Sequence, residues 1–476
     1  MLYNNLGAGS VYNKPESNAT QWSLMSYLAR INYTLKHKYL FSVNARVDGS
    51  SRFGTNNKYG FFPSASAGWR ISEEAFMEPV KEVISNLKLR ASYGFTGNTE
   101  IGVYESLATL GTSNWILGNQ LVSGFFPNKI PNPDLKWERT GQFDIGLDLG
   151  LFNNRLRITT DYYKKKTTDL LYSVAVPATS GYQTMLKNIG SIENQGYELS
   201  IESDNLTGAF SWTTAFNIAF NRNKVLELGG EEYKEMAEGD GHLKTGSVRR
   251  LIVGEPIGVF YGYRFDGIFQ NEEECKQQTS SASPIGVGLR RYKDLNGDGK
   301  VDAANDREIL GDANPKFFGG LTNTFAYKGF ELNVFLQYSY GNKILNYNAM
   351  ELENPTGGQN AYADMVNRWT PENPSNIYPK ATTNRALLVS DRFIEDGSYL
   401  KLKTLSLSYS FPKINLKHIQ GLRLYVTGQN LLTWTKYRGY DPEVSYRGAS
   451  TLEAGEDFGG YPQSRTFMFG IKLDIK

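Results

Sequence analysis

The chain has 476 residues, in which 51 Lys and Arg side chains nearly balance 49 Asp and Glu. This balance argues against nucleic acid as a partner. One cysteine, Cys275, excludes an internal disulfide framework and a cysteine-built zinc site, and three widely separated histidines argue against a histidine metal cluster. No run of about 18 apolar residues occurs, so a transmembrane helix is excluded; strands that alternate can still cross a membrane.

Alternating apolar and polar residues predict about thirteen strands of about ten residues each. In the segment 140–150, for example, Phe143, Ile145 and Leu147 share one face while Asp144 and Asp148 share the other. Such lengths are long for a soluble sandwich and suit a tilted crossing of a bilayer. The strands are expected near 24–34, 39–48, 61–71, 87–96, 140–150, 155–164, 194–203, 210–221, 318–327, 330–340, 398–411, 422–431 and 466–475.

The connections between these strands alternate in length. Short links are expected at 35–38, 151–154, 204–209, 328–329 and 412–421. One intermediate link, 72–86, falls on the short side of the alternation and is expected to include a helical turn. Longer links are expected at 49–60, 97–139, 165–193, 222–317, 341–397 and 432–465. Short turns on one side and long loops on the other are typical of outer-membrane barrels, whose long loops lie outside the cell. The sequence therefore predicts an all-β, antiparallel transmembrane β-barrel in the cell outer membrane.

The parity of the strand count predicts that the barrel is larger than this chain. Thirteen strands place the start of the first strand on the long-loop side and the end of the last strand on the short-turn side. Intact barrels of this type have an even strand number and both ends on the same side. Residues 1–476 are therefore expected to be the C-terminal part of a longer barrel, whose other strands precede Met1.

The stretch DLNGDGKVDAAND, residues 294–306, has the spacing of a calcium loop. It lacks the flanking helices of an EF-hand, and the twelfth position, where a sensor has Glu, is Asn305. A structural calcium ion and a metal-free turn built by Asx and Gly residues are both compatible with the pattern. The predicted ligands are Asp294, Asn296, Asp298, the carbonyl group of Lys300, Asp302 and Asp306.

Aromatic residues occur near many predicted strand ends, where a barrel carries its interfacial girdle. We assign most of Trp69, Trp137, Tyr162, Tyr163, Trp212, Trp434 and Tyr437 to that girdle. Trp115 and Trp369 lie farther from the strands and are the weak candidates for contact with a substrate or a partner. The sequence has no GxSxG, HExxH or phosphate-loop motif, so we expect no enzymatic activity.

Several long segments resemble SusC/RagA-type TonB-dependent outer-membrane transporters. They are residues 47–77, 132–171, 188–201, 294–302 and 424–443, which follow one another in the family's order. The resemblance implies a 22-stranded barrel filled by an N-terminal plug domain that this chain lacks. It implies uptake of oligosaccharides or peptides, driven by the TonB complex through the absent N-terminal part. It also implies a SusD-like surface lipoprotein as partner, in contact with outer-membrane lipid.

Two other interpretations are compatible with the strand pattern. One is a secreted β-rich protein that binds or cleaves glycans and has a calcium-stabilised loop. The other is a standalone small barrel of 12 or 14 strands. The first would require the apolar strand faces to pack inside a closed interior, a structural difference that coordinates reveal directly.

Overall fold

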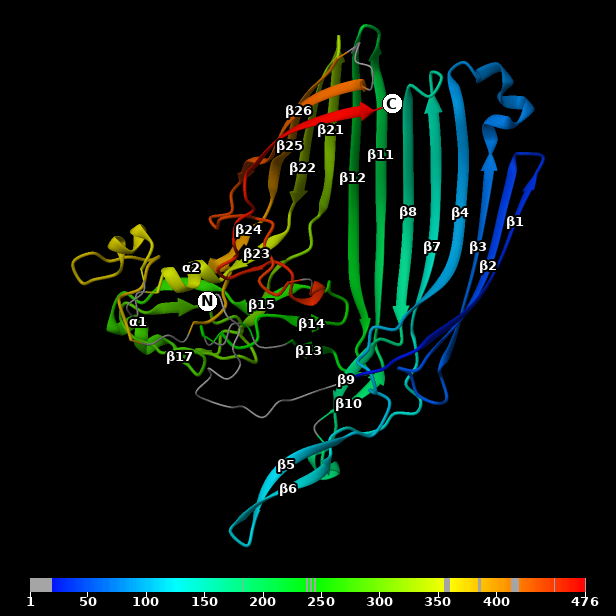
Figure 1. The fold of residues 1–476 in the computed structure, drawn as a ribbon. Coiled ribbons are helices and arrows are strands. Elements are labelled where there is room, and N and C mark those ends of the chain that lie inside the picture. The colour runs from blue at the N-terminus through cyan, green and yellow to red at the C-terminus, as the bar shows by residue number, and fades with distance from the viewer. Residues whose placement is uncertain are drawn as a thin grey trace, which may run out of the picture.

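The structure of the protein is a computed structural model that describes residues 19–475, except 183, 237–238, 240–241, 244, 355–359, 384–386, 412–418 and 449. Thirteen strands form one sheet. Each strand of this sheet pairs, antiparallel, with the strand of the sheet that comes next along the chain. Figure 1 shows these strands as a tall curved wall. All thirteen predicted strands are confirmed. They are β1 (Leu24–Leu35), β2 (Tyr39–Ser50), β3 (Tyr59–Arg70), β4 (Ile84–Asn98), β7 (Glu138–Leu151), β8 (Leu156–Thr168), β11 (Ser191–Thr207), β12 (Phe210–Glu227), β21 (Phe317–Tyr327), β22 (Phe330–Tyr340), β25 (Tyr399–Ser410), β26 (Ile419–Thr435) and β28 (Thr466–Ile475).

The two ends of the wall differ as predicted. Short connections join the described strands at the upper end in Figure 1, and the long connections gather at the lower end. Of the predicted short link 412–421, residues 412–418 lie outside the described residues. Residues with positive φ build several turns, such as Lys36 and His37 between β1 and β2 and Asn153 and Asn154 between β7 and β8. The expected helical turn within 72–86 is present as two 3-10 helices, η2 (Ile71–Glu73) and η3 (Ala75–Val80).

The directions of the outermost strands also agree with the parity argument. Leu24, at the start of β1, pairs with Ser50 at the long-loop end of β2, and Ile475, at the end of β28, pairs with Ile419. Among the described residues, β1 pairs only with β2 and β28 pairs only with β26. The described sheet therefore has two edges with free backbone groups.

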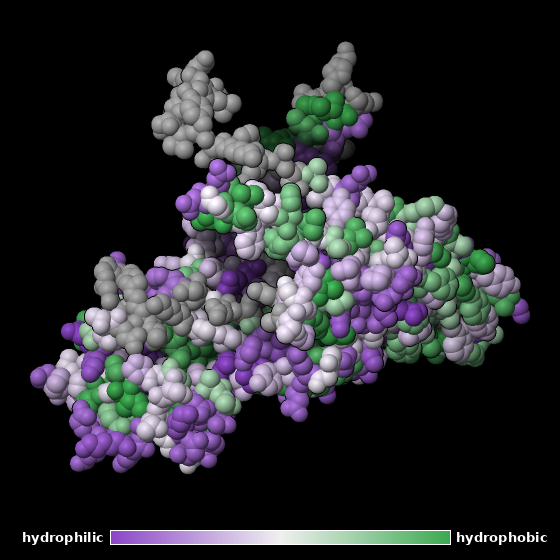
Figure 2. All heavy atoms as spheres, turned by 90° about the horizontal axis from the view of Figure 1, so that it is seen from below, coloured by the Kyte–Doolittle hydropathy of each residue, from purple (hydrophilic) through white to green (hydrophobic). Residues whose placement is uncertain are grey.

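The two faces of the sheet have opposite chemistry. The outward face carries apolar side chains that remain exposed, such as Ile145 (39%), Tyr197 (62%) and Phe469 (81%). No second layer of the described structure packs on them. Figure 2, a view toward the long-loop end, shows green apolar surface on the strand wall at the right and a mostly purple loop region at the lower left. Exposed apolar stripes on a fully paired sheet suit contact with lipid, so the secreted alternative is wrong.

The long loops contain structure that the sequence pattern did not predict. The connections 97–139 and 165–193 contain hairpins, and the connections 222–317, 341–397 and 432–465 contain short strands and helices. In the described residues, no helix has the length and apolar character needed to span a membrane. The loop elements are β5 (Leu110–Leu117), β6 (Gln120–Pro127), β9 (Leu171–Ala175), η4 (Ala178–Ser180), β10 (Thr184–Asn188), β13 (Tyr233–Glu235), β14 (Arg250–Ile252), β15 (Val259–Tyr263), β16 (Phe265–Ile268), α1 (Glu272–Gln277), β17 (Thr279–Ser280), β18 (Arg290–Tyr292), β19 (Lys300–Val301), β20 (Arg307–Asp312), β23 (Lys343–Asn346), α2 (Tyr347–Leu352), η5 (Ala363–Asn367), η6 (Asp391–Phe393), β24 (Ile394–Asp396), η7 (Thr451–Glu453) and β27 (Glu456–Asp457).

Candidate functional site

The inward face of the wall carries charged side chains in hydrogen-bonded groups. Arg90 on β4 donates to both carboxylate oxygens of Asp148 on β7, at 3.0 and 2.9 Å, and to Asp161 on β8 at 2.9 Å. Lys88 lies 3.5 Å from the same Asp148. Burial of these charges in hydrocarbon would cost several kcal/mol each, so this face of the sheet contacts water or other polar groups.

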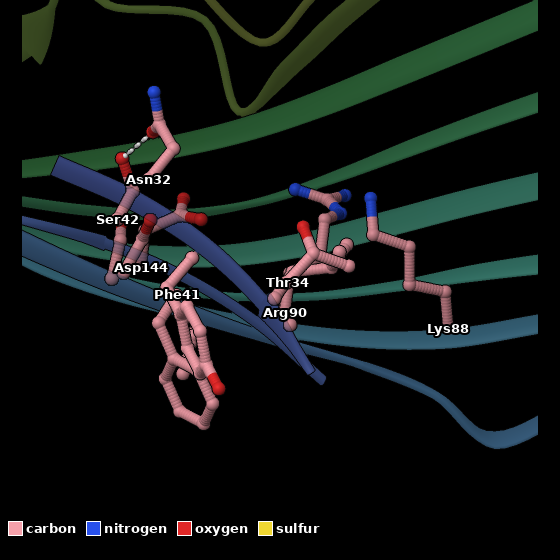
Figure 3. Close-up of a pocket in the computed structure, with 14 residues that line it drawn as sticks. Asn32, Thr34, Phe41, Ser42, Lys88, Arg90 and Asp144 are labelled. Atoms are coloured by element: carbon pink, nitrogen blue, oxygen red, sulfur yellow. Dashed lines mark hydrogen bonds between the residues drawn. The ribbon is translucent and has the colours of Figure 1, made fainter. Parts of the chain in front are cut away.

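A pocket of about 340 Å³ opens on this inward face, between β1, β2, β3, β4 and β7. In Figure 3, Asn32, Ser42 and Asp144 project to one side of the ribbon, and Phe41 projects to the other. Ser42 donates a hydrogen bond to Asn32 at 2.6 Å. Hydroxyl, amide and carboxylate groups side by side can hydrogen-bond a polar molecule, whereas the apolar ring of Phe41 belongs to the outward face.

A second inward pocket, of about 430 Å³, lies nearer the long loops. Arg46 and Asp48 form an ion pair of 2.7 Å on its polar side. Trp137 closes its apolar side and is only 7% exposed, because it packs against Phe53 and Phe62. Our assignment of Trp137 to the lipid girdle is therefore wrong: the ring belongs to a small core at the loop end of the wall.

Three long loops combine into one compact unit, which we call the loop body: the described residues within 228–316, 341–398 and 436–465. Its central core contains side chains that are more than 100 residues apart in sequence. Phe260 from the first loop and Tyr347 and Phe393 from the second are completely buried. Phe458 from the third loop packs against the same core, 5.9 Å from Tyr347 between ring centroids. The loop body is therefore a folded unit at the outer end of the wall.

Ion pairs with at least one buried partner connect the loops of this unit. Arg249 of the first loop donates to Glu456 of the third at 2.9 Å, and both side chains are 2% exposed. Glu353 of the second loop accepts from Arg392 at 2.6 Å and from Arg438 of the third loop at 2.8 Å. Buried pairs need this geometry to offset their desolvation, and breaking one leaves a buried charge without compensation. Their main consequence is a fixed arrangement of the three loops.

The predicted calcium loop lies in the first of these loops, and its oxygens serve its own backbone. Asp294 accepts from the amide groups of Gly297 and Gly299, both at 2.7 Å, and Gly299 has the positive φ (80°) expected at that turn. Asp306, completely buried, accepts from the amides of Leu295 and Asp302.

These contacts give the loop a metal-free explanation. Asp298 accepts from the backbone amide of Lys300. The ammonium of Lys300 lies 3.1 Å from Asp302 and so pairs with a carboxylate that a bound metal ion would need. In the described part of the chain, no group of three or more His, Cys, Asp or Glu side chains is arranged to hold a metal ion. As placed here the proposed ligands do not converge, and calcium binding stays a prediction.

The comparisons with known proteins agree on one family. A family profile described as "TonB dependent receptor-like, beta-barrel" matches residues 2–431. The chain belongs to the TonB-dependent receptor family. Its relatives are of the SusC/RagA type, as the sequence motifs indicated. Membership places the TonB-dependent receptor barrel, and with it this wall, in the outer membrane.

Curated relatives match almost the whole chain. It is 41% identical to TonB-dependent receptor P3 of Formosa agariphila, over 99% of this chain and 47% of that protein. It is 32% identical to TonB-dependent receptor SusC of Bacteroides thetaiotaomicron, over 96% of this chain and 44% of the relative. The chain thus spans about half the length of the curated TonB-dependent receptors that it matches.

Solved structures give the same fold. A structure titled "Structure of the RagAB peptide importer in the 'open-open' state" superposes with a TM-score of 0.82 at 27% identity, over 98% of this chain and 48% of that chain. The "Structure of the RagAB peptide transporter" superposes with a TM-score of 0.79 at 28% identity, over 95% of this chain and 48% of that chain. The predicted fold class is therefore confirmed.

The remaining aromatic residues of this TonB-dependent receptor divide between the two faces. Tyr162 and Trp212 lie on the outward face, as do Trp69 and Trp434, in agreement with a girdle. Tyr163, next to Tyr162 on β8, points inward and donates to Asn221 at 2.9 Å. Tyr437 is 5% exposed and donates to Asp457 inside the loop body. The girdle assignment is therefore wrong for these last two.

The two candidate contact residues are already engaged by the protein's own loops. The indole of Trp115 covers the backbone at Gly124 across the β5–β6 hairpin, while 58% of Trp115 remains exposed. Trp369 packs over Gly288 and donates from its indole nitrogen to Gln270 at 3.1 Å. Contact of either residue with a substrate stays a prediction.

Proposed function

We propose that the complete protein imports oligomeric nutrients, either oligosaccharides or peptides, across the outer membrane, with energy from TonB. The observation that carries this proposal is the pairing of two surfaces on one sheet: apolar side chains face outward and ion-paired polar side chains face inward. Together with family membership, this arrangement supports a wall around a hydrated path. The motive step would belong to a plug and a TonB contact, which the resemblance implies for the complete protein.

A SusD-like lipoprotein is the partner that we propose for the loop body. Two solved relatives are described as the RagAB peptide transporter and the RagAB peptide importer. The ion-paired and rigid loop body at the outer end of the wall is the part of this chain that such a partner would meet. Substrate would then be enclosed between the lipoprotein and the inward face.

Uptake by intact cells tests the proposal. Deletion of the full-length gene should abolish growth on at least one member of a panel of single oligosaccharides and peptides, and the plasmid-borne gene should restore it. Inactivation of TonB should give the same defect as the deletion. Unchanged growth of the deletion strain on every panel member, with no loss of uptake of labelled oligomers, would refute the import function.

A further inference from the structure

The loop body has a small pocket between its first and second loops, distinct from the two pockets of the inward face. The segment after β17, at the left of Figure 1, forms one side of it. Its volume is about 110 Å³, and it is lined by Ser283, Pro284, Leu289, Arg290, Tyr292, Asn354, Pro379 and Thr382. Pro284 is exposed, whereas Arg290, Tyr292 and Pro379 are buried. The pocket therefore has a mouth at Pro284 and a buried floor.

Arg290 brings a buried guanidinium to this floor, and only 9% of the residue is exposed. One terminal nitrogen donates to the backbone carbonyl oxygen of Glu353 at 3.0 Å, and the guanidinium carbon lies 5.7 Å from the ring centroid of Phe393. The Nε atom of Arg290 is buried and has no hydrogen-bond partner. A buried donor without an acceptor costs stability, so the floor favours a ligand that supplies an acceptor.

The positive charge of Arg290 is compensated only in part by the protein. Glu353 attracts Arg290 electrostatically, but its two carboxylate oxygens accept from Arg392 at 2.6 Å and from Arg438 at 2.8 Å. Within the described residues, Arg290 itself forms no ion pair. Burial lowers the pKa of Arg290, and repulsion from Arg392 lowers it further. Because a guanidinium nevertheless stays protonated, a buried positive charge remains available to an anion.

The size and the walls of the pocket select the kind of anion. At ~30 Å³ for each water-sized group, the pocket has room for about four such groups, enough for a carboxylate and one or two carbon atoms. Pro284, Leu289 and Pro379 supply apolar surface for those carbon atoms. A guanidinium N–H is a strong donor to a carboxylate oxygen. A sugar ring is too large for the pocket, and a phosphate carries more charge than one partly compensated guanidinium offsets.

We propose that this pocket binds a carboxylate group on a short carbon chain, with the carboxylate at Arg290 and the chain directed past Pro284. Two sources can present this group: a free small organic acid, or the end of a longer molecule such as the C-terminus of a peptide. The site gives the loop body a means of recognising negative charge. It needs only the folded loop body and does not depend on the proposed import function.

Saturation-transfer NMR of the full-length protein in detergent, titrated with propionate, tests the site. Wild type should bind propionate saturably, and Arg290→Gln should weaken binding at least tenfold, the effect of one lost charge-assisted hydrogen bond. Arg290 also packs on Phe393, so a second variant separates binding from folding. Ser283→Trp fills the mouth without removing a contact of Arg290 and should abolish binding. Ser281→Trp is the matched control: Ser281 is exposed, does not line the pocket, and its replacement should leave binding unchanged.

A second titration, with trialanine and trialanine amide, identifies the source of the carboxylate. Tighter binding of trialanine than of propionate, with no binding of the amide, supports the site and assigns it to chain ends. Binding of propionate but not of trialanine supports the site and assigns it to free acids. Equal propionate binding by wild type, Arg290→Gln and Ser283→Trp would overturn the proposal, as would no binding by wild type or tighter binding of inorganic phosphate than of propionate.

Discussion

The ammonium of Lys401 lies 2.6 Å from a carboxylate oxygen of Glu443, and this contact ties the third loop of the loop body to the wall. Lys401, on the inward face of β25, is 1% exposed and also lies 2.6 Å from Asp441. Lys403 of the same strand adds a contact of 3.0 Å to Glu443. Residues 441–443 of this loop therefore lie over the inward face of β25.

Lys401→Met should release this loop. The substitution leaves the carboxylate of Asp441 without a cation and that of Glu443 with Lys403 alone. Removal of one partner from a buried ion pair costs about 3–5 kcal/mol. Limited proteolysis of the full-length protein should cut within 436–465 at least tenfold faster than in wild type. Lys472, 69% exposed on its side chain and 3.9 Å from Asp474, supplies the control, because Lys472→Met breaks only a surface pair. Equal cleavage rates for both variants would refute the role of Lys401.

The contact of Lys401 and Lys403 with Glu443 also predicts that the stability of this loop depends on pH. Burial alone would raise the pKa of Glu443, but hydrogen bonds from Lys401 and Lys403 outweigh it and lower the pKa from 4.5 to about 2. A carboxyl with a lowered pKa stabilises the fold fully above its unfolded pKa, and this contribution is lost as the pH falls from 4.5 toward 2. Protease resistance of the loop should therefore decrease over this interval. In Glu443→Gln the decrease should be smaller; an identical pH profile would contradict the assignment.

Glu353 connects the second and third loops of the loop body, so its replacement by the neutral residue Gln should loosen this unit. Glu353→Gln keeps the shape but weakens the charge-assisted contacts with Arg392 and Arg438, which we expect to cost about 2–3 kcal/mol. Hydrogen exchange of the α2 amides, measured by mass spectrometry, should accelerate while the amides of β7 and β8 keep their protection. Uniform acceleration in both regions would show that the pair supports the whole fold rather than the loop body.

The turn at 294–306 depends on Asp306 more than on the exposed carboxylates. Asp306→Ala removes the acceptor of two buried backbone amides, at a cost of about 2 kcal/mol. Asp298 is exposed, so its removal should cost less. Proteolysis within 294–306 should accelerate in Asp306→Ala and change little in Asp298→Ala. Repeating both digests with calcium and with chelator tests the predicted ion: protection by calcium that Asp298→Ala removes would support it, and equal rates in both conditions would exclude it.

The sequence predicted the wall well because the bilayer imposes a simple pattern on it. Alternation such as that of Phe143 to Asp148 identifies a strand and both of its faces at once. Neighbouring residues on a strand point to opposite faces, so Tyr162 and Tyr163 could not both have joined the girdle. That rule, applied to the sequence, would have assigned one of the pair to the interior.

The loop body could not be predicted in the same way. Its core brings together Phe260, Tyr347 and Phe458, which lie in three separate connections and show no common period. Its ion pairs, such as Arg249 with Glu456, join residues 207 positions apart. Trp137 and Tyr437 flank strands just as girdle residues do, and only the packing of the loops reveals that they are buried.

The account depends most on the claim that the apolar face contacts acyl chains and the polar face contacts water. Spin labels at Ile145 and Asp144, on β7 of the full-length protein with Cys275 replaced, measure this directly in lipid vesicles. The label at 145 should be accessible to oxygen and protected from a water-soluble nickel reagent, and the label at 144 should lack this lipid signature. Equal access of the nickel reagent to both labels would contradict it.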